Sequence, residues 1–210
     1  MKIKIKICGM TRPEDAQTAL ELGADRIGII SCPQSPRNIS PARMIAIANS
    51  VPNRKLVLVV ADKPLYELLD LVEMLEEKIG RIQFHGSESP ELLRSISRIF
   101  PDTEIVRCIH ALDDIRRYDH AADRFLLEPK GDLPGGNGKA FDWRSLGKRD
   151  LSDRFILAGG LNAENVLDAL EATGAKELDL CSGAEESPGI KSRKKMEEFI
   201  NIARNKETES

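Results

Sequence analysis

Several features that would assign this chain of 210 residues to a special class are missing. No apolar run approaches the roughly 20 residues that a membrane-spanning helix needs. The first ten residues alternate Lys with Ile and lack the continuous apolar core of a signal peptide. A formal net charge of -3 gives no electrostatic reason to expect a nucleic acid partner. The sequence therefore predicts a cytoplasmic globular protein that binds neither membranes nor nucleic acid.

The sequence also lacks any pattern of closely spaced metal ligands. Its four cysteines (Cys8, Cys32, Cys108 and Cys181) are scattered, with no CxxC pair and no ligand spacing to the three histidines. Cysteines placed in this way in a cytoplasmic protein are expected to be free thiols. We therefore expect free thiols and no metal site.

What the sequence does contain is an alternation of strand and helix patterns along its whole length. Several strand patterns, such as LVLVV and FILA, are continuous apolar runs, as expected of strands buried on both faces of a parallel sheet. Thr11 and Glu14 have the spacing of a capping box at the first helix, and Ser40 precedes the second. Gly80 is expected to form the turn before the fourth strand. The predicted strands cover residues 3–8, 26–30, 56–61, 81–85, 104–109, 125–128, 155–158 and 177–181.

The number and size of these units favour a closed barrel. An open doubly wound α/β sheet has the same alternation, but eight compact units of about 26 residues, without a long insertion, fit a (β/α)8 TIM barrel better. No linker or low-complexity segment divides the chain. We therefore predict a single-domain α/β barrel with a parallel eight-stranded core over residues 1–205, and a polar tail at residues 206–210.

In such a barrel the active site forms at the C-terminal ends of the strands. Cys8 closes the first strand, and it is either a small buried hydrophobe or a base with a pKa below the usual value of about 8.5. Arg37 follows the second strand and suits a substrate carboxylate, although it could be a solvated loop residue. His85 closes the fourth strand as a substrate contact or as a hydrogen-bonded buried imidazole. Glu128 places a carboxylate at the end of the sixth strand.

Glycines after the last two strands indicate an anion site. Gly160 follows the seventh strand and Gly183 the eighth, and glycines there let backbone N–H groups approach an anion. Barrels commonly bind a phosphate at this edge. Each glycine alone could be a simple turn residue, but the pair favours phosphate binding. The GGNGK loop after Glu128 is either part of an active-site edge or an inert solvent loop.

Six segments together resemble one known family. They are IKICGMTRPEDA, SPRNIS, IQFHGSESPE, GGNGKAFDW, LAGGLNAENV and DLCSGAEESPGIKS. Their order is that of the phosphoribosylanthranilate isomerase family, and the resemblance extends from residue 5 to about residue 199. Any one of these segments is a weak signal, whereas the complete set is highly specific.

This resemblance implies a cofactor-free (β/α)8 barrel of tryptophan biosynthesis that performs an Amadori rearrangement of N-(5-phosphoribosyl)anthranilate. Cys8 matches the general base, and Glu128 occupies the position of the general acid. Arg37 matches the residue that binds the anthranilate carboxylate, while His85 and Asp179 match other substrate-contacting positions. The expected partner is a small phosphosugar, bound by a monomer or a homodimer. The implied phosphate-binding residues are Gly136, Gly138, Gly159, Gly160, Ser182 and Gly183.

Glu128 departs from the family pattern, which has aspartate at this position. The glutamate carboxyl lies about one methylene further from the backbone, and a displacement of that order can cost about 100-fold in rate. Aromatic residues form only 4% of the chain, and Phe84 replaces the usual leucine of Q-L-HG, so we expect a differently shaped anthranilate pocket. Two alternatives stay open: a related isomerase of another amino-sugar phosphate, and a phosphosugar-binding barrel with weakened chemistry.

Overall fold

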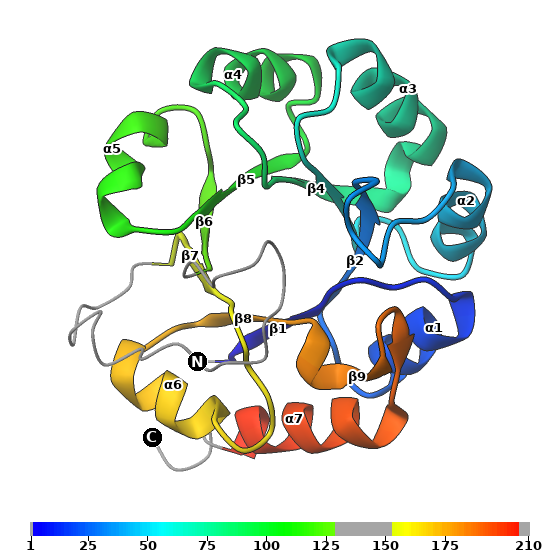
Figure 1. The fold of residues 1–210 in the computed structure, drawn as a ribbon, viewed down its shortest axis with the longest axis vertical. Coiled ribbons are helices and arrows are strands. Elements are labelled where there is room, and N and C mark those ends of the chain that lie inside the picture. The colour runs from blue at the N-terminus through cyan, green and yellow to red at the C-terminus, as the bar shows by residue number, and fades with distance from the viewer. Residues whose placement is uncertain (1, 129–152, 206–210) are drawn as a thin grey trace.

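The computed structural model describes residues 2–128 and 153–205, and its centre is a closed barrel of parallel strands (Figure 1). Neighbouring strands follow the order of the sequence, and β8 closes the barrel by pairing with β1. The predicted (β/α)8 barrel is therefore confirmed. Its strands are β1 (Lys4–Ile7), β2 (Arg26–Ser31), β3 (Leu56–Val60), β4 (Ile79–Phe84), β5 (Glu104–Ile109), β6 (Arg124–Leu127), β7 (Phe155–Leu157) and β8 (Glu177–Leu180).

Helices form a ring around the barrel (Figure 1). They are α1 (Pro13–Glu21), α2 (Pro41–Asn49), α3 (Leu65–Leu75), α4 (Pro90–Ile99), α5 (Ile115–Tyr118), α6 (Val166–Thr173) and α7 (Arg193–Asn205). Short 3-10 turns occur at η1 (Glu76–Lys78), η2 (Leu112–Asp114) and η4 (Ser182–Ala184). A small antiparallel pair that the sequence patterns did not predict, β9 (Glu185–Ser187) with β10 (Ile190–Lys191), precedes α7. The predicted tail at 206–210 lies outside the described residues.

The main core lies between the outer face of the barrel and the helices. β3 and β4 are buried along their whole length, as their position between the helices and the barrel interior requires. From α3, the side chains of Leu68, Leu71, Val72 and Leu75 join this core on one face of the helix. No helix in residues 2–128 or 153–205 combines the length and the apolar character that crossing a membrane requires.

Local sequence signals set some element ends, and tertiary contacts override others. Ser40 caps α2 as predicted, because its hydroxyl accepts a hydrogen bond from the Arg43 N–H at 3.4 Å. The capping box predicted at Thr11 is wrong: its hydroxyl donates instead to the carbonyl of Gly189 at 2.5 Å. The turn predicted at Gly80 is also wrong. Gly80 lies within β4, where the Arg54 carbonyl approaches so closely that a Cβ would collide with it.

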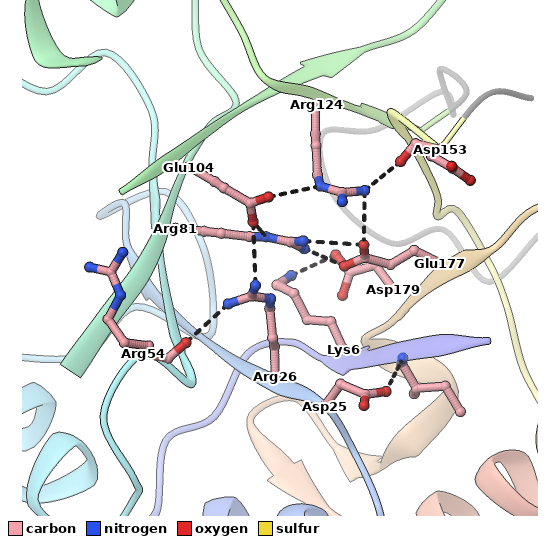
Figure 2. A network of polar contacts seen from close by, with 11 residues as sticks. Lys6, Asp25, Arg26, Arg54, Arg81, Glu104, Arg124, Asp153, Glu177 and Asp179 are labelled. Atoms are coloured by element: carbon pink, nitrogen blue, oxygen red, sulfur yellow. Dashed lines mark hydrogen bonds and ion pairs between the residues drawn. The ribbon is translucent and has the colours of Figure 1, made fainter. Parts of the chain in front are cut away.

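A network of buried ion pairs fills the N-terminal end of the barrel (Figure 2). Arg81 and Glu177 are 1% and 3% exposed, and the guanidinium of Arg81 donates two hydrogen bonds to the Glu177 carboxylate. Glu104 accepts from Arg81 at 2.5 Å and from Arg124 at 3.1 Å. Arg124 also lies 3.3 Å from Glu177. The charges neutralise one another, and the pair of Arg81 with Glu177 is shielded from water, so each carboxylate is needed by its neighbours.

Replacing Glu177 by glutamine is expected to lower the free energy of unfolding by about 3–5 kcal/mol, because the substitution removes the buried carboxylate that pairs with both Arg81 and Arg124 and leaves these two cations with the partly exposed carboxylate of Glu104. Urea denaturation would measure the change. The matched control is Glu198→Gln on α7, whose partner Lys194 is 84% exposed and 3.8 Å away. That control should cost less than about 0.5 kcal/mol. Equal effects of both substitutions would contradict the assigned role of Glu177.

Candidate active site

The strand ends of the barrel carry the predicted site residues on one rim. Cys8 directly follows β1, His85 follows β4 and Glu128 follows β6. Asp179 lies in the last half of β8, and Arg37 lies in the loop between β2 and α2. Because all the strands of the barrel are parallel, their C-terminal ends face the same side. The fold therefore gathers residues that lie up to 171 positions apart, the interval from Cys8 to Asp179 (179 − 8).

Cys8 is a buried thiol in a polar setting. It is 5% exposed and packs against Val57 and Val59 of β3. A hydrogen bond with the thiol of Cys181 and the positive charge of Lys6 lower the pKa of Cys8 to about 7, against the opposing effect of burial. A pKa lowered to about 7 means that a substantial fraction of the Cys8 side chains is thiolate at neutral pH. Cys8 can therefore accept a proton, which its expected role as a base requires.

Lys6 and Asp179 form a buried ion pair inside the barrel (Figure 2). Lys6 Nζ lies 2.7 Å from Asp179 Oδ2, and the two residues are 0% and 7% exposed. Burial alone would lower the pKa of Lys6, but the adjacent Asp179 raises it above its usual value, so the ammonium stays charged. The charges of both residues act on Cys8 and on Glu128. Within the described part of the chain, Asp179 Oδ1 is buried without a hydrogen-bond partner.

Glu128 carries a carboxyl group that holds its proton more tightly than an exposed glutamate does. Burial, and after it the negative charge of Asp179, raise the pKa of Glu128 above its usual value. The Cys108 thiol lies 3.9 Å from Glu128 Oε2, and His85 Nδ1 lies 3.7 Å from the same oxygen. The backbone is held as well, since His110 Nδ1 is 2.6 Å from the Glu128 carbonyl oxygen. A protonated carboxyl in this position can serve as a proton donor.

His85 presents a neutral imidazole to Glu128. Burial and the nearby cations Lys6 and Arg107 lower the pKa of His85 to about 3. Its Nε2 atom lies 2.5 Å from the amide nitrogen of Gln83, which fixes the ring. Since the imidazole is neutral, its approach to Glu128 is a polar contact rather than an ion pair.

Three of these side chains could also hold a metal ion. The ligand atoms of His85, Cys108 and Glu128 all lie within 4.8 Å of one another. Nitrogen, sulfur and oxygen donors of this kind are those that zinc accepts. The spacing of these residues along the sequence could not indicate such a cluster, because each comes from a different strand of the barrel.

The loop that follows β4 is tied to its neighbours, which positions His85. The Asp62 carboxylate accepts hydrogen bonds from the backbone N–H and the hydroxyl of Ser87, both at 2.6 Å. Glu88 accepts from Arg107 at 2.8 Å and from the Asp62 N–H at 2.8 Å. The HGSE segment therefore joins the ends of β3 and β5, and it leaves the imidazole little freedom to move.

Arg37 is held by a carboxylate of its own chain. Its Nε and Nη2 atoms donate to the two oxygens of Glu185, each at 2.7 Å, and both residues are buried. Lys191 also donates to Glu185, at 2.9 Å. The stem of Arg37 crosses Gly9, where a Cβ would lie 2.6 Å from Arg37 Cδ. Arg37 is thus not a solvated loop residue, and a substrate carboxylate would have to approach the remaining Nη1 edge of its guanidinium.

The ends of β7 and β8 form a backbone-rich corner. Gly159 and Gly160 have positive φ angles of 88° and 70°, which few other residues adopt. A Cβ on Gly183 would collide with the carbonyl of Leu161, so the loops after β7 and β8 are in contact. Ser182 opens the η4 turn beside them. Two of the predicted phosphate-binding residues lie outside the described residues: Gly136 and Gly138.

Sequence patterns alone did not identify several residues that shape this site. Lys6 could have been found, because the two-residue period of a strand puts it on the same face as Cys8. Glu185 could also have been found, since it is the acidic residue of the SG-x-E segment. Gln83 could have been found as well, since it lies two residues before His85 and contacts its ring. Cys108 and His110 required the folded structure, because their contacts with Glu128 join separate strands.

Comparison with known proteins identifies the relatives of this chain. Residues 5–202 match the sequence model of the family described as N-(5'phosphoribosyl)anthranilate (PRA) isomerase. The N-(5'-phosphoribosyl)anthranilate isomerase of Sinorhizobium medicae is 41% identical to this chain over 216 aligned residues. That alignment covers 99% of this chain and 100% of the relative.

Solved structures give the same result. Phosphoribosyl anthranilate isomerase from Thermus thermophilus is 32% identical, with a TM-score of 0.80, over 95% of this chain and 98% of that protein. A phosphoribosyl anthranilate isomerase in complex with reduced 1-(o-carboxyphenylamino)-1-deoxyribulose 5-phosphate is 29% identical, with a TM-score of 0.77, over 97% and 99%. These similarities do not favour either of the two alternatives left open by the sequence. The chain belongs to the N-(5'-phosphoribosyl)anthranilate isomerase family.

Proposed function

We propose that this chain catalyses the Amadori rearrangement of N-(5-phosphoribosyl)anthranilate to 1-(2-carboxyphenylamino)-1-deoxyribulose 5-phosphate, with Cys8 as general base and Glu128 as general acid. One observation carries the proposal: a thiol with a lowered pKa and a carboxyl with a raised pKa lie on one rim of the barrel. A reaction that uses both a base and an acid at neutral pH is helped when the pKa of the base is lowered and the pKa of the acid is raised.

In the first step, Glu128 protonates the ring oxygen of the ribose. The bond between that oxygen and C1′ breaks, and the lone pair of the anthranilate nitrogen forms a C=N double bond to C1′. The raised pKa of Glu128 supports this role, because it keeps a proton available for donation. Asp179 contributes through its negative charge, which disfavours the ionised form of Glu128.

In the second step, the Cys8 thiolate removes the proton from C2′. The electrons of the C–H bond form a C1′=C2′ double bond, and the electrons of the C=N bond return to nitrogen, which gives an enolamine. Ketonisation of this enolamine yields the product. Lys6 supports the step, because its positive charge stabilises the thiolate before the proton is taken up.

Substrate binding is assigned to polar groups that the barrel positions in advance. Arg37 binds the anthranilate carboxylate at its Nη1 edge, while Glu185 keeps the guanidinium in place. Asp179 accepts a hydrogen bond from a sugar hydroxyl through its buried Oδ1 atom, and His85 contacts the sugar beside Glu128. A buried acceptor without a partner is costly unless a ligand supplies one, which supports the assignment of Asp179.

The phosphate group is assigned to the corner formed by β7 and β8. Backbone N–H groups of Gly159, Gly160, Ser182 and Gly183 would bind it, together with Gly136 and Gly138 of the loop after Glu128. The absence of side chains at the glycines lets a phosphate approach these backbone groups closely, and barrels commonly bind phosphate at this edge. Anchoring the far end of the substrate would convert binding energy into orientation at C1′ and C2′.

The remaining assignments follow from this activity. The rearrangement moves protons and electron pairs within one molecule and is redox-neutral, so we propose that it needs no cofactor. The partner is a small phosphosugar rather than nucleic acid or a membrane. We also assign the chain to the cytoplasm as a monomer or homodimer, with residues 1–205 as one domain.

Expression of the chain in a tryptophan auxotroph that lacks only this isomerase should restore growth without tryptophan. The matched control is the double variant Cys8→Ala, Glu128→Ala, which should accumulate to the same level without restoring growth. The purified chain should also convert N-(5-phosphoribosyl)anthranilate to its isomer, separated by chromatography. Failure of rescue and of conversion, in a folded chain that still binds the reduced product analogue, would overturn the proposed function.

A further inference from the structure

A second cysteine lies beside Cys8 at the mouth of the barrel. β1 and β8 are paired in parallel, with Lys6 opposite Asp179 and Ile7 opposite Leu180. The Cys8 N–H donates to the Leu180 carbonyl at 2.8 Å, which continues this ladder by one more step. The next pair in the same register is therefore Cys8 with Cys181.

The two thiols point into the same space. Side chains two residues apart on a strand share a face, and Lys6 meets Asp179 at 2.7 Å inside the barrel. Cys8 and Cys181, two residues further along each strand, follow the same direction. The sulfur of Cys181 lies 3.2 Å from where a Cβ on Gly9 would stand, directly after Cys8. It packs against the small cluster of Cys8, Val57 and Val59, and the two thiols are hydrogen-bonded.

The backbone geometry of this pair suits a disulfide bond. Neighbouring strands lie about 4.8 Å apart, which falls within the range of about 4.4–6.8 Å between the Cα atoms of bonded cysteines. Both cysteines are free thiols.

We propose that Cys8 and Cys181 are a reversible oxidation site: a hydroperoxide converts the two thiols into a disulfide, and a dithiol restores them. The effect of this disulfide on turnover rests on the proposed function, in which Cys8 is the general base. When Cys8 is bonded to Cys181 it has no lone pair with the basicity of a thiolate. Turnover stops until the bond is reduced.

The chemistry balances with hydrogen peroxide as the oxidant. The Cys8 thiolate attacks one peroxide oxygen, the O–O bond breaks, and a sulfenic acid forms with release of hydroxide. The Cys181 sulfur then attacks the Cys8 sulfur and displaces its hydroxyl, which leaves as water with the Cys181 proton. Two thiols and one hydrogen peroxide thus give one disulfide and two waters. A small dithiol reverses the bond by thiol–disulfide exchange.

The surroundings favour Cys8 as the thiol that reacts first. Lys6 and the Cys181 hydrogen bond favour the Cys8 thiolate, whereas the pKa of Cys181 is raised by that same hydrogen bond and by burial. Thiolates are the reactive form towards peroxide. Cys181 is then the neutral thiol that resolves the sulfenic acid. Its presence would also prevent further oxidation of Cys8 to the irreversible sulfinic acid.

The test treats the purified full-length chain with hydrogen peroxide and measures mass and turnover. We expect a product lighter by two hydrogens, a cross-linked peptide containing Cys8 and Cys181 in a non-reducing digest, and a loss of turnover of about 100-fold or more, the effect of losing the base. Dithiothreitol should restore both the mass and the turnover.

Two variants complete the test. Cys181→Ser should form no cross-link. With excess peroxide its turnover, relative to its own untreated value, should return only in part with dithiothreitol, because Cys8 without a resolving thiol is oxidised further to the sulfinic acid, which a mass increase of two oxygens would show. Cys32→Ser, which removes a thiol in the loop after β2, should respond like the unmodified chain. A peroxide-inactivated chain without the Cys8–Cys181 peptide would overturn the proposal. The cross-link is read by mass alone, so it decides the inference even if the untreated chain has no isomerase activity.

Discussion

Replacing Glu128 by glutamine should lower kcat/KM by about 10²–10⁴-fold, the usual contribution of a general acid. Glutamine keeps the size and most polar contacts of the side chain but has no proton to donate to the ring oxygen. Cys108 and His85 both lie near the Oε2 atom of Glu128. Because glutamine fills the same space, the substitution changes the chemistry more than the shape of the site. Binding of the reduced product analogue should change little, which separates loss of chemistry from loss of structure.

The control for this prediction is Glu128→Asp, which keeps an acid and adopts the residue of the family pattern. It shortens the side chain by one methylene, so we expect a loss of about 100-fold or less, and in any case more activity than in Glu128→Gln. The pH profile provides an independent readout. Activity in the unmodified chain should fall as pH rises through the raised pKa of Glu128, because the donor is then ionised. If Glu128→Gln retained full kcat/KM, another group would have to be the acid.

The barrel could be predicted from the sequence because its signals are local. Continuous apolar strands, such as the fully buried β3, are separated by amphipathic helices, and each unit carries its own signal of a parallel sheet. The errors occurred where a contact from elsewhere replaced the local signal. Thr11 bonds to Gly189 rather than capping α1, and Gly80 adapts to the Arg54 carbonyl rather than forming a turn.

The gathering of the candidate residues on one rim was predictable, but their pairings were not. Cys8 and Glu128 were predicted to lie on the same rim because each ends a strand, and parallel strands place their ends together. The environment that gives these groups their protonation states comes from distant residues. Lys6 pairs with Asp179, 173 residues away, and Arg37 with Glu185, 148 residues away. Such pairs depend on closure of the barrel and on strand register, which a pattern within one segment does not contain.

The role of Arg37 illustrates this limit. A guanidinium in a loop after a strand suits a substrate carboxylate, and this remains our proposal. The folded chain adds a carboxylate of its own, Glu185, which occupies one edge of the same group. The arginine is thereby fixed before substrate arrives, and less conformational entropy is lost on binding.

Replacing Cys8 by alanine should lower kcat by about 10²–10⁴-fold, because no other group is assigned to take the C2′ proton. Cys8→Ser is the stricter test. It keeps a hydroxyl of similar size, but a hydroxyl has a much higher pKa than a thiol and remains protonated near neutral pH. Both variants should bind the reduced product analogue nearly as well as the unmodified chain, since the carboxylate and phosphate contacts are assigned to other residues.

The role of Cys8 as a base also predicts the direction in which the activity of the unmodified chain changes with pH. Cys8 acts as a base only when deprotonated, so kcat/KM should rise with pH through about 7, the pKa of its thiol, and fall away below it. The rate of alkylation of Cys8 by iodoacetamide, followed by mass spectrometry, should rise over the same range, since only the thiolate reacts. Cys108 provides the internal comparison, because burial raises its pKa well above the usual value. An alkylation midpoint for Cys8 near that of an ordinary thiol, at about 8.5, would contradict the thiolate environment built by Lys6 and Cys181.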